Sequence, residues 1–567
     1  MAQSLFPAPQ GRGFLFFLRI VVVSMLATSA AGCASLPSNV ARPVSKAFNT
    51  PDETALGRLV QQRRTHAAAR SDSGFRLLDS VDLAFTSRLA LIEGAQRSLD
   101  LQYYAIHADG STEQLLDRLR SAAARGVRVR ILLDDFNSVG ADAQVLRLGF
   151  LKNIELRLYN PLPGSRASLM GRIFTSLHDV GQLQKRMHNK LFIADNAWGI
   201  AGGRNLGDTY FGRGEDSNFV DLDVLAAGRI VRDMSSSFDS YWNNELAYPV
   251  ESLLNKQDLD RLRKPVAAAV GTVSSQAPGP TAVTATVTPT ASVLPGVTVT
   301  GVQSRALDLQ QVPLTWAPSV LMVDKPGKVG PGDDEVDAGD TLIDGLLALM
   351  GRARSDLLII SPYFVPGQPM MKVFADLRRR GVRIRVLTNS LASNDAPAAH
   401  AGYARYRKQL LGLGVDLYEM RAEQEGSPGG LGSGINARAA QTSVFGSGGG
   451  AGGSKAGTSR ASLHSKAVII DAQLAIIGSM NLDLRSQLKN SEVALVIRSA
   501  ALARESIRLV ETSLARGAYR LELNGNTLAW RAPPGAPFKD ATSEPEASTK
   551  LKLLVNVIGP FAPDEML

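Results

Sequence analysis

The sequence predicts an α/β protein made of two fused, sandwich-like halves that resemble each other. Two observations support this fold class. A strand–helix–strand pattern of similar length occurs twice, and each copy is followed by the same short polar motif. The spacing is typical of a parallel sheet with a crossover helix. Its repetition indicates internal duplication, with the two halves related by a pseudo-twofold axis.

The composition fits a chain with substantial hydrophobic cores. The protein has 567 residues, of which 44% are hydrophobic and 20% are charged, and this excludes a wholly disordered chain. A net charge of +9 is modest for this length and suits anionic lipid or nucleic acid. Cys33 is the single cysteine, which excludes a disulfide scaffold and a thiolate metal site.

The amino terminus has the pattern of an export signal. The apolar run over 20–31 follows two arginines; it is short for a bilayer span but suits the core of a signal peptide. The small residues before Cys33 resemble a bacterial lipobox, so we expect removal of the lipoprotein signal peptide 1–32 and lipidation of Cys33. The alternative is an uncleaved, tilted anchor that begins at Phe14. Both predict a membrane-attached protein outside the cytosol, and the first a lipoprotein on the periplasmic face of a bacterial envelope.

The first half, over 75–250, contains the first copy of the pattern. We expect a strand over 99–104, a helix over 112–124, and a turn and second strand over 125–134. Alternating apolar residues mark the strands, and the longer amphipathic stretch marks the helix.

The second half, over 340–515, repeats this order. We expect a strand over 357–363, a helix over 370–380 and a strand over 381–388. The same connection in both halves predicts the same sheet topology in both.

Two stretches of biased composition interrupt the halves. The segment 267–302 carries no charge and consists mainly of Ala, Val, Thr, Pro, Ser and Gly, as expected of a linker. The segment 426–462 is rich in Gly, Ser and Ala; it lacks the Gly-Lys-Ser/Thr ending of a P-loop, so we interpret it as an insertion. In the final segment, 516–567, an Asn-Gly-Asn turn between 519–523 and 527–530 predicts a hairpin.

Each half also contains a His-x-Lys-x4-Asp motif, followed at matching offsets by small residues and an asparagine. The offsets from the histidine to the other residues agree in both halves. The first set comprises His188, Lys190, Asp195, Gly203 and Asn205, and the second comprises His464, Lys466, Asp471, Ser479 and Asn481.

These residue types suit chemistry at a phosphoryl group. Residues i and i+2 of a strand face the same way, so each histidine should lie beside its lysine. Two ammonium groups and two asparagine amides can neutralise a phosphoryl group. The small residues beyond each strand let the backbone approach closely, so we expect the substrate to be bound by Asn205, Asn481, Gly203 and Ser479. Two imidazoles can supply a nucleophile and a general acid or base. No cluster of carboxylates accompanies the motifs, so we expect no metal and no cofactor, with the lysines in the role that magnesium has elsewhere.

The paired motifs resemble those of the phospholipase D superfamily. The surrounding residues are similar, more narrowly, to the branch of bacterial cardiolipin synthases called cardiolipin synthase C. The segments that carry this narrower resemblance are 186–190, 202–211, 221–223 and 362–366, with Tyr403 and Tyr406. The resemblance covers nearly the whole mature chain except 267–302 and 426–462, and it implies a phospholipase D-like fold with the active site between the halves.

The resemblance also implies roles for individual residues. One histidine forms a phosphohistidine while the other protonates the departing alcohol and deprotonates the incoming one. An acidic residue downstream of each motif orients a histidine, and Asp221 and Glu492 match best, although Asp223 is adjacent to the former. The motif aspartates Asp195 and Asp471 fit a structural role that holds the strand and turn together.

The function implied is a membrane-attached phosphatidyltransferase that makes cardiolipin. Its partners would be phosphatidylglycerol, a second phospholipid such as phosphatidylethanolamine, the membrane surface and an accessory protein. We expect the segments 362–366 and 210–211 to exclude water, and Tyr403 and Tyr406 to contact the acceptor. The alternatives are a phospholipase D hydrolase that releases phosphatidic acid, a nuclease and a non-catalytic lipid-binding lipoprotein. Export and the absence of a long basic tail argue against nucleic acid as a partner.

Overall fold

The structure is a computed structural model. It describes residues 36–164, 166, 172–173, 180–254, 258, 304–330, 341–423, 430–433 and 460–558. Cys33, the predicted signal segment 1–32 and the predicted linker 267–302 lie outside these residues, as does most of the predicted insertion 426–462. None of the helices within these ranges combines the length and the hydropathy that a membrane span requires.

The first half begins with helices and strands that alternate along the chain, as the sequence predicts. Its elements up to the first motif are α2 (Ala55–His66), β1 (Ser73–Leu78), α3 (Val81–Gly94), β2 (Ser98–Tyr103), α4 (Gly110–Ala124), β3 (Arg128–Asp134), η2 (Asp142–Phe150), β4 (Ile154–Tyr159) and α6 (Val180–Gln184). Those after it are β5 (Leu191–Ala194), β6 (Trp198–Gly202), η3 (Asp208–Phe211), β7 (Ser217–Val220), β8 (Asp223–Gly228), α7 (Arg229–Trp242), β9 (Ala247–Pro249) and α8 (Val250–Leu253).

The second half follows the same order. Its elements up to the second motif are β10 (Thr315–Trp316), β11 (Ser319–Val323), η4 (Pro326–Val329), α10 (Leu342–Met350), β12 (Asp356–Ile360), α11 (Gly367–Arg379), β13 (Arg383–Asn389), α12 (Pro397–Gly412), β14 (Asp416–Met420) and β15 (Arg460–Leu463). Those after it are β16 (Ala467–Ile470), β17 (Leu474–Gly478), α13 (Leu484–Leu488), β18 (Val493–Arg498), α14 (Ala500–Gly517), β19 (Ala518–Asn524), β20 (Thr527–Arg531) and α15 (Thr549–Ile558). A short helix η1 (Pro51–Glu53) precedes α2.

The strand order confirms the internal duplication. The first sheet runs β10-β1-β8-β6-β5-β2-β3-β4-β9, and the second runs β11-β18-β17-β16-β12-β13-β14-β19-β20. The central trio β2-β3-β4 is parallel, as is β12-β13-β14. The motif strands β5 and β16 occupy equivalent places and pair antiparallel to β2 and β12. The predicted α/β fold of two similar halves is therefore correct.

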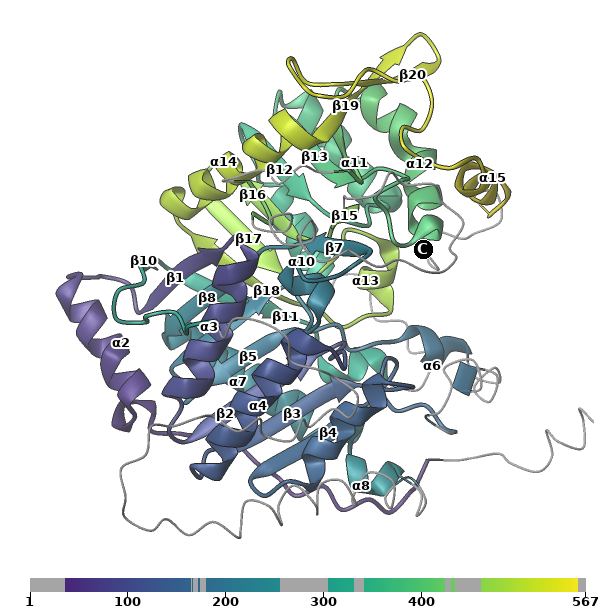
Figure 1. Cartoon of the computed structure of the whole chain (residues 1–567). Coiled ribbons are helices and arrows are strands. Elements are labelled where there is room, and N and C mark those ends of the chain that lie inside the picture. The colour runs from purple at the N-terminus through teal and green to yellow at the C-terminus, as the bar shows by residue number, and fades with distance from the viewer. Residues whose placement is uncertain are drawn as a thin grey trace, which may run out of the picture.

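The halves share a central hydrophobic core, which fixes one against the other. This core combines buried residues of both sheets with the apolar faces of α7 and α14. Helices α3 and α4 cover the outer face of the first sheet, and α10, α11 and α12 cover the outer face of the second (Figure 1). The motif strands β5 and β16 therefore lie in the middle of their sheets, and β6 of one half lies against β17 of the other.

The predicted hairpin forms and is part of the second sheet. β19 pairs with β20 and also, in antiparallel register, with β14. The Asn-Gly-Asn turn leads into a pair that extends the sheet of the second half, so residues 518–531 belong to that half rather than to a separate terminal segment.

Candidate active site

The two motifs meet where the halves adjoin. Backbone pairing across the interface fixes both histidines: His188 N donates to Ser491 O (2.9 Å) and His464 N donates to Val220 O (2.8 Å). Ser491 and Val220 immediately precede Glu492 and Asp221 in the sequence. Each motif histidine is therefore tied to the residue before an acid of the opposite half.

The acids orient the histidines in a crossed arrangement. His188 Nδ1 lies 3.0 Å from Glu492 Oε2 and 3.1 Å from Oε1, and His464 Nδ1 lies 2.6 Å from Asp221 Oδ2. Each ring thus shares its Nδ1 hydrogen with a carboxylate of the other half. This leaves the lone pair at Nε2, the atom that is free for attack or proton transfer.

The structure also shows that Asp221 and its neighbour Asp223 have different partners. Asp223 accepts from Arg88 Nη2 at 3.0 Å and lies 3.2 Å from Arg204 Nε, so it belongs to a buried ion pair behind the site. Both aspartates are buried, and only Asp221 contacts a histidine.

The two acids are supported differently, and this explains why Gly203 and Ser479 differ at equivalent positions. A Cβ atom on Gly203 would lie 2.4 Å from Asp221 Oδ1, so only glycine leaves room for this short acid. In the second half the longer Glu492 reaches back to Ser479, whose Oγ donates to Oε2. The contacts of Gly203 and Ser479 are therefore with the acids, and the two residues position Asp221 and Glu492, whereas we had expected them to bind the substrate.

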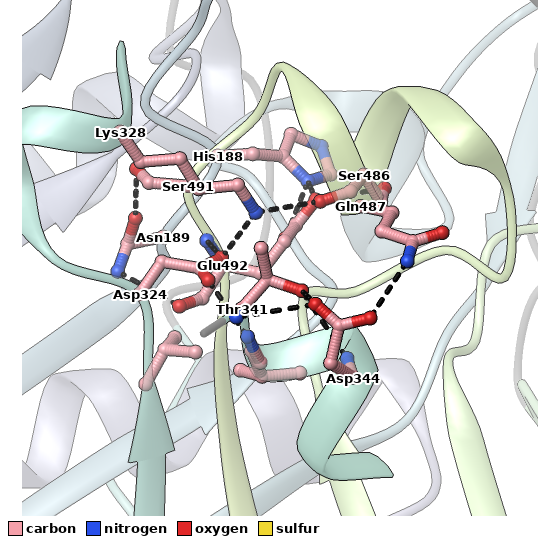
Figure 2. Close-up of polar contacts among 12 residues, drawn as sticks. His188, Asn189, Asp324, Lys328, Thr341, Asp344, Ser486, Gln487, Ser491 and Glu492 are labelled. Carbon is pink, nitrogen blue, oxygen red and sulfur yellow. Dashed lines mark hydrogen bonds and ion pairs between the residues drawn. The ribbon is translucent and has the colours of Figure 1, made fainter. Parts of the chain in front are cut away.

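A network of polar side chains holds Glu492 in place (Figure 2). Ser486 Oγ donates to Glu492 Oε1 (2.9 Å), and the backbone N of Glu492 donates to Asp324 Oδ2 (2.9 Å). Asp324 is paired with Lys328 Nζ at 2.8 Å, and both side chains are buried. A segment upstream of α10 therefore helps to orient the acid, and nothing in its sequence pattern marked it in advance.

The motif lysines are buried beside the histidines. Lys190 Nζ donates to His188 O (2.8 Å) and Lys466 Nζ donates to His464 O (2.6 Å). Burial lowers the pKa of Lys190 to about 7 and the pKa of Lys466 to about 8. Lys466 also lowers the pKa of both Lys190 and His188 in the other half. An anionic phosphoryl group bound beside the two lysines would stabilise their charged forms.

We expect the pH profile of kcat/KM, which reports the ionisation of groups in the free enzyme, to be bell-shaped. A histidine should set its acidic limb and the two lysines its alkaline limb. Burial lowers the pKa of His188 to about 4, so its neutral, nucleophilic form is lost as the pH falls through about 4. Lys190 and Lys466 lose their charge as the pH rises through about 7 and about 8, so activity should fall there. Steady-state kinetics across this range measures both limbs.

The matched control for the alkaline limb is Lys190→Arg. A guanidinium stays charged, so the remaining limb should follow Lys466 and move from about pH 7 to about pH 8. An alkaline limb that does not move in this variant would assign the limb to another group.

The two asparagines differ in their contacts. Asn205 Nδ2 donates to the Tyr210 hydroxyl (3.0 Å), and its Oδ1 accepts from Ala105 N (3.2 Å). Asn481 Oδ1 is buried, and among the described residues no hydrogen-bond donor contacts it. Asn205 therefore holds Tyr210, whereas the carbonyl oxygen of Asn481 has no donor among the described residues.

The motif aspartates lie at the far end of the motif strands from the histidines. Asp195 accepts from the backbone N of Gln96 (2.9 Å), Arg97 (2.7 Å) and Ser98 (2.9 Å). Asp471 makes the equivalent contacts with the backbone N of residues 354–356. Both aspartates have positive φ, 52° and 53°. They fix the turn and the start of the neighbouring strand, so both are structural members of the motifs rather than catalytic residues.

Aromatic side chains line both histidines. The ring of Tyr104 packs edge-on against His188 (5.2 Å between centroids), and the ring of Tyr210 packs edge-on against His464 (5.4 Å). Phe219 also contacts His464. The Tyr363 hydroxyl donates to Asp395 (2.9 Å), and the charge of Asp395 raises the pKa of Lys466 against the lowering effect of burial. Phe219 and Asp395 were missed by the sequence analysis, since neither belongs to a motif.

Two residues expected near the substrate belong to the core. Phe211 packs against Phe85 on the outer face of the first sheet. Tyr403 is 2% exposed and packs with His400 and Phe364. The site prediction was therefore wrong for Phe211 and Tyr403.

Comparison with known proteins agrees with this geometry. The family described as "Cardiolipin synthase, PLD-like domain" matches residues 89–242 and 346–513, the two stretches that contain both motifs. The chain belongs to this phospholipase D-like cardiolipin synthase family.

Individual relatives span both halves. The chain is 36% identical over 453 residues to cardiolipin synthase C of Escherichia coli (strain K12), covering 79% of this chain and 86% of the relative. It is 22% identical to cardiolipin synthase A of Cronobacter sakazakii, covering 82% of this chain and 74% of that one. The crystal structure of phosphatidylserine synthase from Haemophilus influenzae matches 89% of this chain and 100% of its own, with a TM-score of 0.51 at 13% identity, and shows the shared fold.

Proposed function

We propose that the protein is a membrane-attached phosphatidyltransferase that makes cardiolipin from phosphatidylglycerol and a second phospholipid. The observation that carries the proposal is the crossed site: two imidazoles, each oriented by an acid of the opposite half, lie with two buried ammonium groups. The similarity to cardiolipin synthase C across both halves supports the choice of lipid substrate.

The first step breaks the bond between phosphorus and the headgroup oxygen of the donor lipid. Nε2 of one motif histidine attacks phosphorus and forms a phosphohistidine. The other motif histidine, in its protonated imidazolium form, gives its proton to the departing alcohol. The negative charge of the bound phosphate favours that protonated form. Lys190 and Lys466 stabilise the charge that develops on the phosphoryl oxygens.

The second step returns the enzyme to its starting state. The neutral imidazole takes the proton from a hydroxyl of the acceptor phosphatidylglycerol, whose oxygen then attacks phosphorus. The phosphorus–nitrogen bond breaks and cardiolipin forms. With phosphatidylglycerol as donor the released alcohol is glycerol, and with phosphatidylethanolamine it is ethanolamine. Water in place of the acceptor would give phosphatidic acid.

The choice between acceptor lipid and water is tested with purified protein and labelled phosphatidylglycerol in vesicles. We expect mainly cardiolipin, with phosphatidic acid as a minor product. Phosphatidic acid as the dominant product, with acceptor lipid in excess and membrane extract supplied as a source of accessory protein, would identify a hydrolase.

Replacement of Tyr363 by alanine should shift the products toward phosphatidic acid. Tyr363 lies beside Tyr210 and Asp395 at the site, so loss of its ring opens that space to water. Tyr363→Phe keeps the ring and should keep the wild-type product ratio. The same ratio in Tyr363→Ala and wild type would show that this ring does not exclude water.

The attachment to a membrane rests on the sequence around Cys33. We expect a mature chain of 567 − 32 = 535 residues that begins with a lipidated Cys33. Two or more acyl chains would anchor it stably beside its lipid substrate. Mass spectrometry of protein extracted from the envelope measures this, with Cys33→Ser as the unlipidated control. An intact chain that retains Met1, or an unmodified Cys33, would contradict it.

A further inference from the structure

The C-terminal helix α15 presents an apolar face to solvent. Among the residues that the structure describes, six large hydrophobic side chains are exposed, and three of them lie on α15. These are Leu553, Leu554 and Val557, which are 64%, 44% and 57% exposed. Spacings of three and four residues place them on one side of the helix. A concentrated apolar stripe of this kind indicates a binding surface, unlike scattered apolar residues.

The chain holds this helix in place through the segment that precedes it. Glu544 forms an ion pair with Arg407 of α12 and lies 3.6 Å from His400 Nε2. Glu546 pairs with Arg421 and also accepts from Ala422 N (3.1 Å). The exposed stripe therefore sits on an anchored element that packs on α12.

The charge of α15 complements an anionic surface. Lys550 and Lys552 are its charged residues, and its sequence contains no acidic side chain. Lys550 lies three and seven residues before Leu553 and Val557, so it belongs to the same side of the helix. The nearby acids Glu544 and Glu546 are already paired with arginines. Lysines beside an apolar stripe suit the boundary between anionic headgroups and acyl chains.

The position of α15 connects it with the site. α15 lies at the edge of the molecule beside α12 (Figure 1). On α12, Arg405, Tyr406 and Gln409 line an open surface hollow together with Leu484, the first residue of α13. α13 also contains Ser486, which donates to Glu492. A membrane at α15 would therefore lie next to the helix that lines this hollow.

We propose that α15 is a membrane-docking helix that lies in the interface of an anionic bilayer, with Leu553, Leu554 and Val557 inserted among the acyl chains. This contact is additional to an N-terminal anchor and orients the body of the protein on the lipid surface. The proposal concerns membrane depth, so it does not depend on the reaction that the site catalyses.

The test measures the depth of a single residue. A Cys33→Ser full-length chain allows one introduced cysteine, Val557→Cys, to be labelled with an environment-sensitive fluorophore. The matched control is Val320→Cys. Val320 is 62% exposed on β11, the edge strand of the second sheet at the other end from β20. The vesicles contain brominated lipids, with either phosphatidylglycerol or phosphatidylcholine alone. Because the label reports its own surroundings, attachment through the amino terminus does not produce the signal.

We expect strong quenching at position 557 on anionic vesicles, weak quenching on phosphatidylcholine and none at position 320. Leu553→Asp with Leu554→Asp should weaken quenching at 557 by about tenfold or more, because each buried leucine contributes enough for about a tenfold change in partition. Lys550→Glu with Lys552→Glu should remove the preference for anionic lipid.

Three results would overturn the proposal. Equal quenching at both positions, or none at either, would show that α15 does not insert. A label at 557 that is shielded without vesicles and becomes exposed when residues 559–567 are removed would show that the chain's own tail covers the stripe. Shielding that grows with protein concentration would show that a second copy does.

Discussion

His188→Ala and His464→Ala should each abolish lipid transfer. The two imidazoles have separate duties, nucleophile and proton carrier, and neither can be replaced by the other because each is held by its own acid. We expect kcat to fall by at least about 10⁴-fold in either variant, and the double variant to lose little more, because the two residues act as a unit. Initial rates with labelled phosphatidylglycerol measure the loss.

Two controls make this result specific. His66 is an exposed histidine on α2, so His66→Ala should keep the wild-type rate. Each active-site variant should still unfold in a cooperative thermal transition, because neither histidine belongs to the hydrophobic cores. A folded His188→Ala or His464→Ala protein that retains wild-type turnover would contradict the shared site.

Glu492→Gln and Asp221→Asn should be the next most damaging changes. Each amide keeps the shape of the acid but can donate to Nδ1, which moves the imidazole hydrogen to Nε2 and blocks attack there. We expect losses of about 10² to 10⁴-fold in kcat/KM. The loss should appear mainly in kcat, since each acid acts through the histidine that it orients.

The motif aspartates give the contrasting control. Asp471→Ala removes an acceptor for the backbone N of residues 354–356, so it should lower the free energy of unfolding by about 1 to 3 kcal/mol. The turnover of the folded fraction should stay near the wild-type value. If Asp471→Ala instead lost activity as severely as Glu492→Gln without losing stability, the division between orienting and structural acids would be wrong.

The motif residues could be recognised in the sequence because their constraint is local. His188 and Lys190 lie two residues apart, and the matching offset at His464 and Lys466 shows that the spacing is required twice. The strand–helix–strand units were predictable for the same reason, since periodicity within ten to fifteen residues determines each element. Both kinds of pattern can be recognised without knowing how the halves pack.

The pairing of acids with histidines was not predictable in the same way. Glu492 contacts His188 over 304 residues, and Asp221 contacts His464 over 243. Which acid serves which histidine depends on the packing of one half against the other. The choice of Asp221 over Asp223 depends on Arg88 and Arg204, which hold Asp223 behind the site.

The aromatic residues show a second limit. Tyr210 and Phe211 are adjacent in η3, but one ring meets His464 and the other packs against Phe85 in the core. Neighbouring residues point in different directions, so assigning a whole segment to the substrate places half of it wrongly. Tyr403 failed for a similar reason, because its side of α12 packs on the second sheet rather than on the site.

The central claim is that both motifs form one site with one covalent intermediate. The most direct measurement is to quench the reaction with phosphatidylglycerol labelled in its phosphatidyl group and to map the label by mass spectrometry under conditions that preserve phosphohistidine. We predict at most one phosphatidyl group per chain, on either His188 or His464, and its complete loss in the alanine variant of that histidine. Two phosphatidyl groups per chain, or labelling that persists in both His188→Ala and His464→Ala, would contradict the claim.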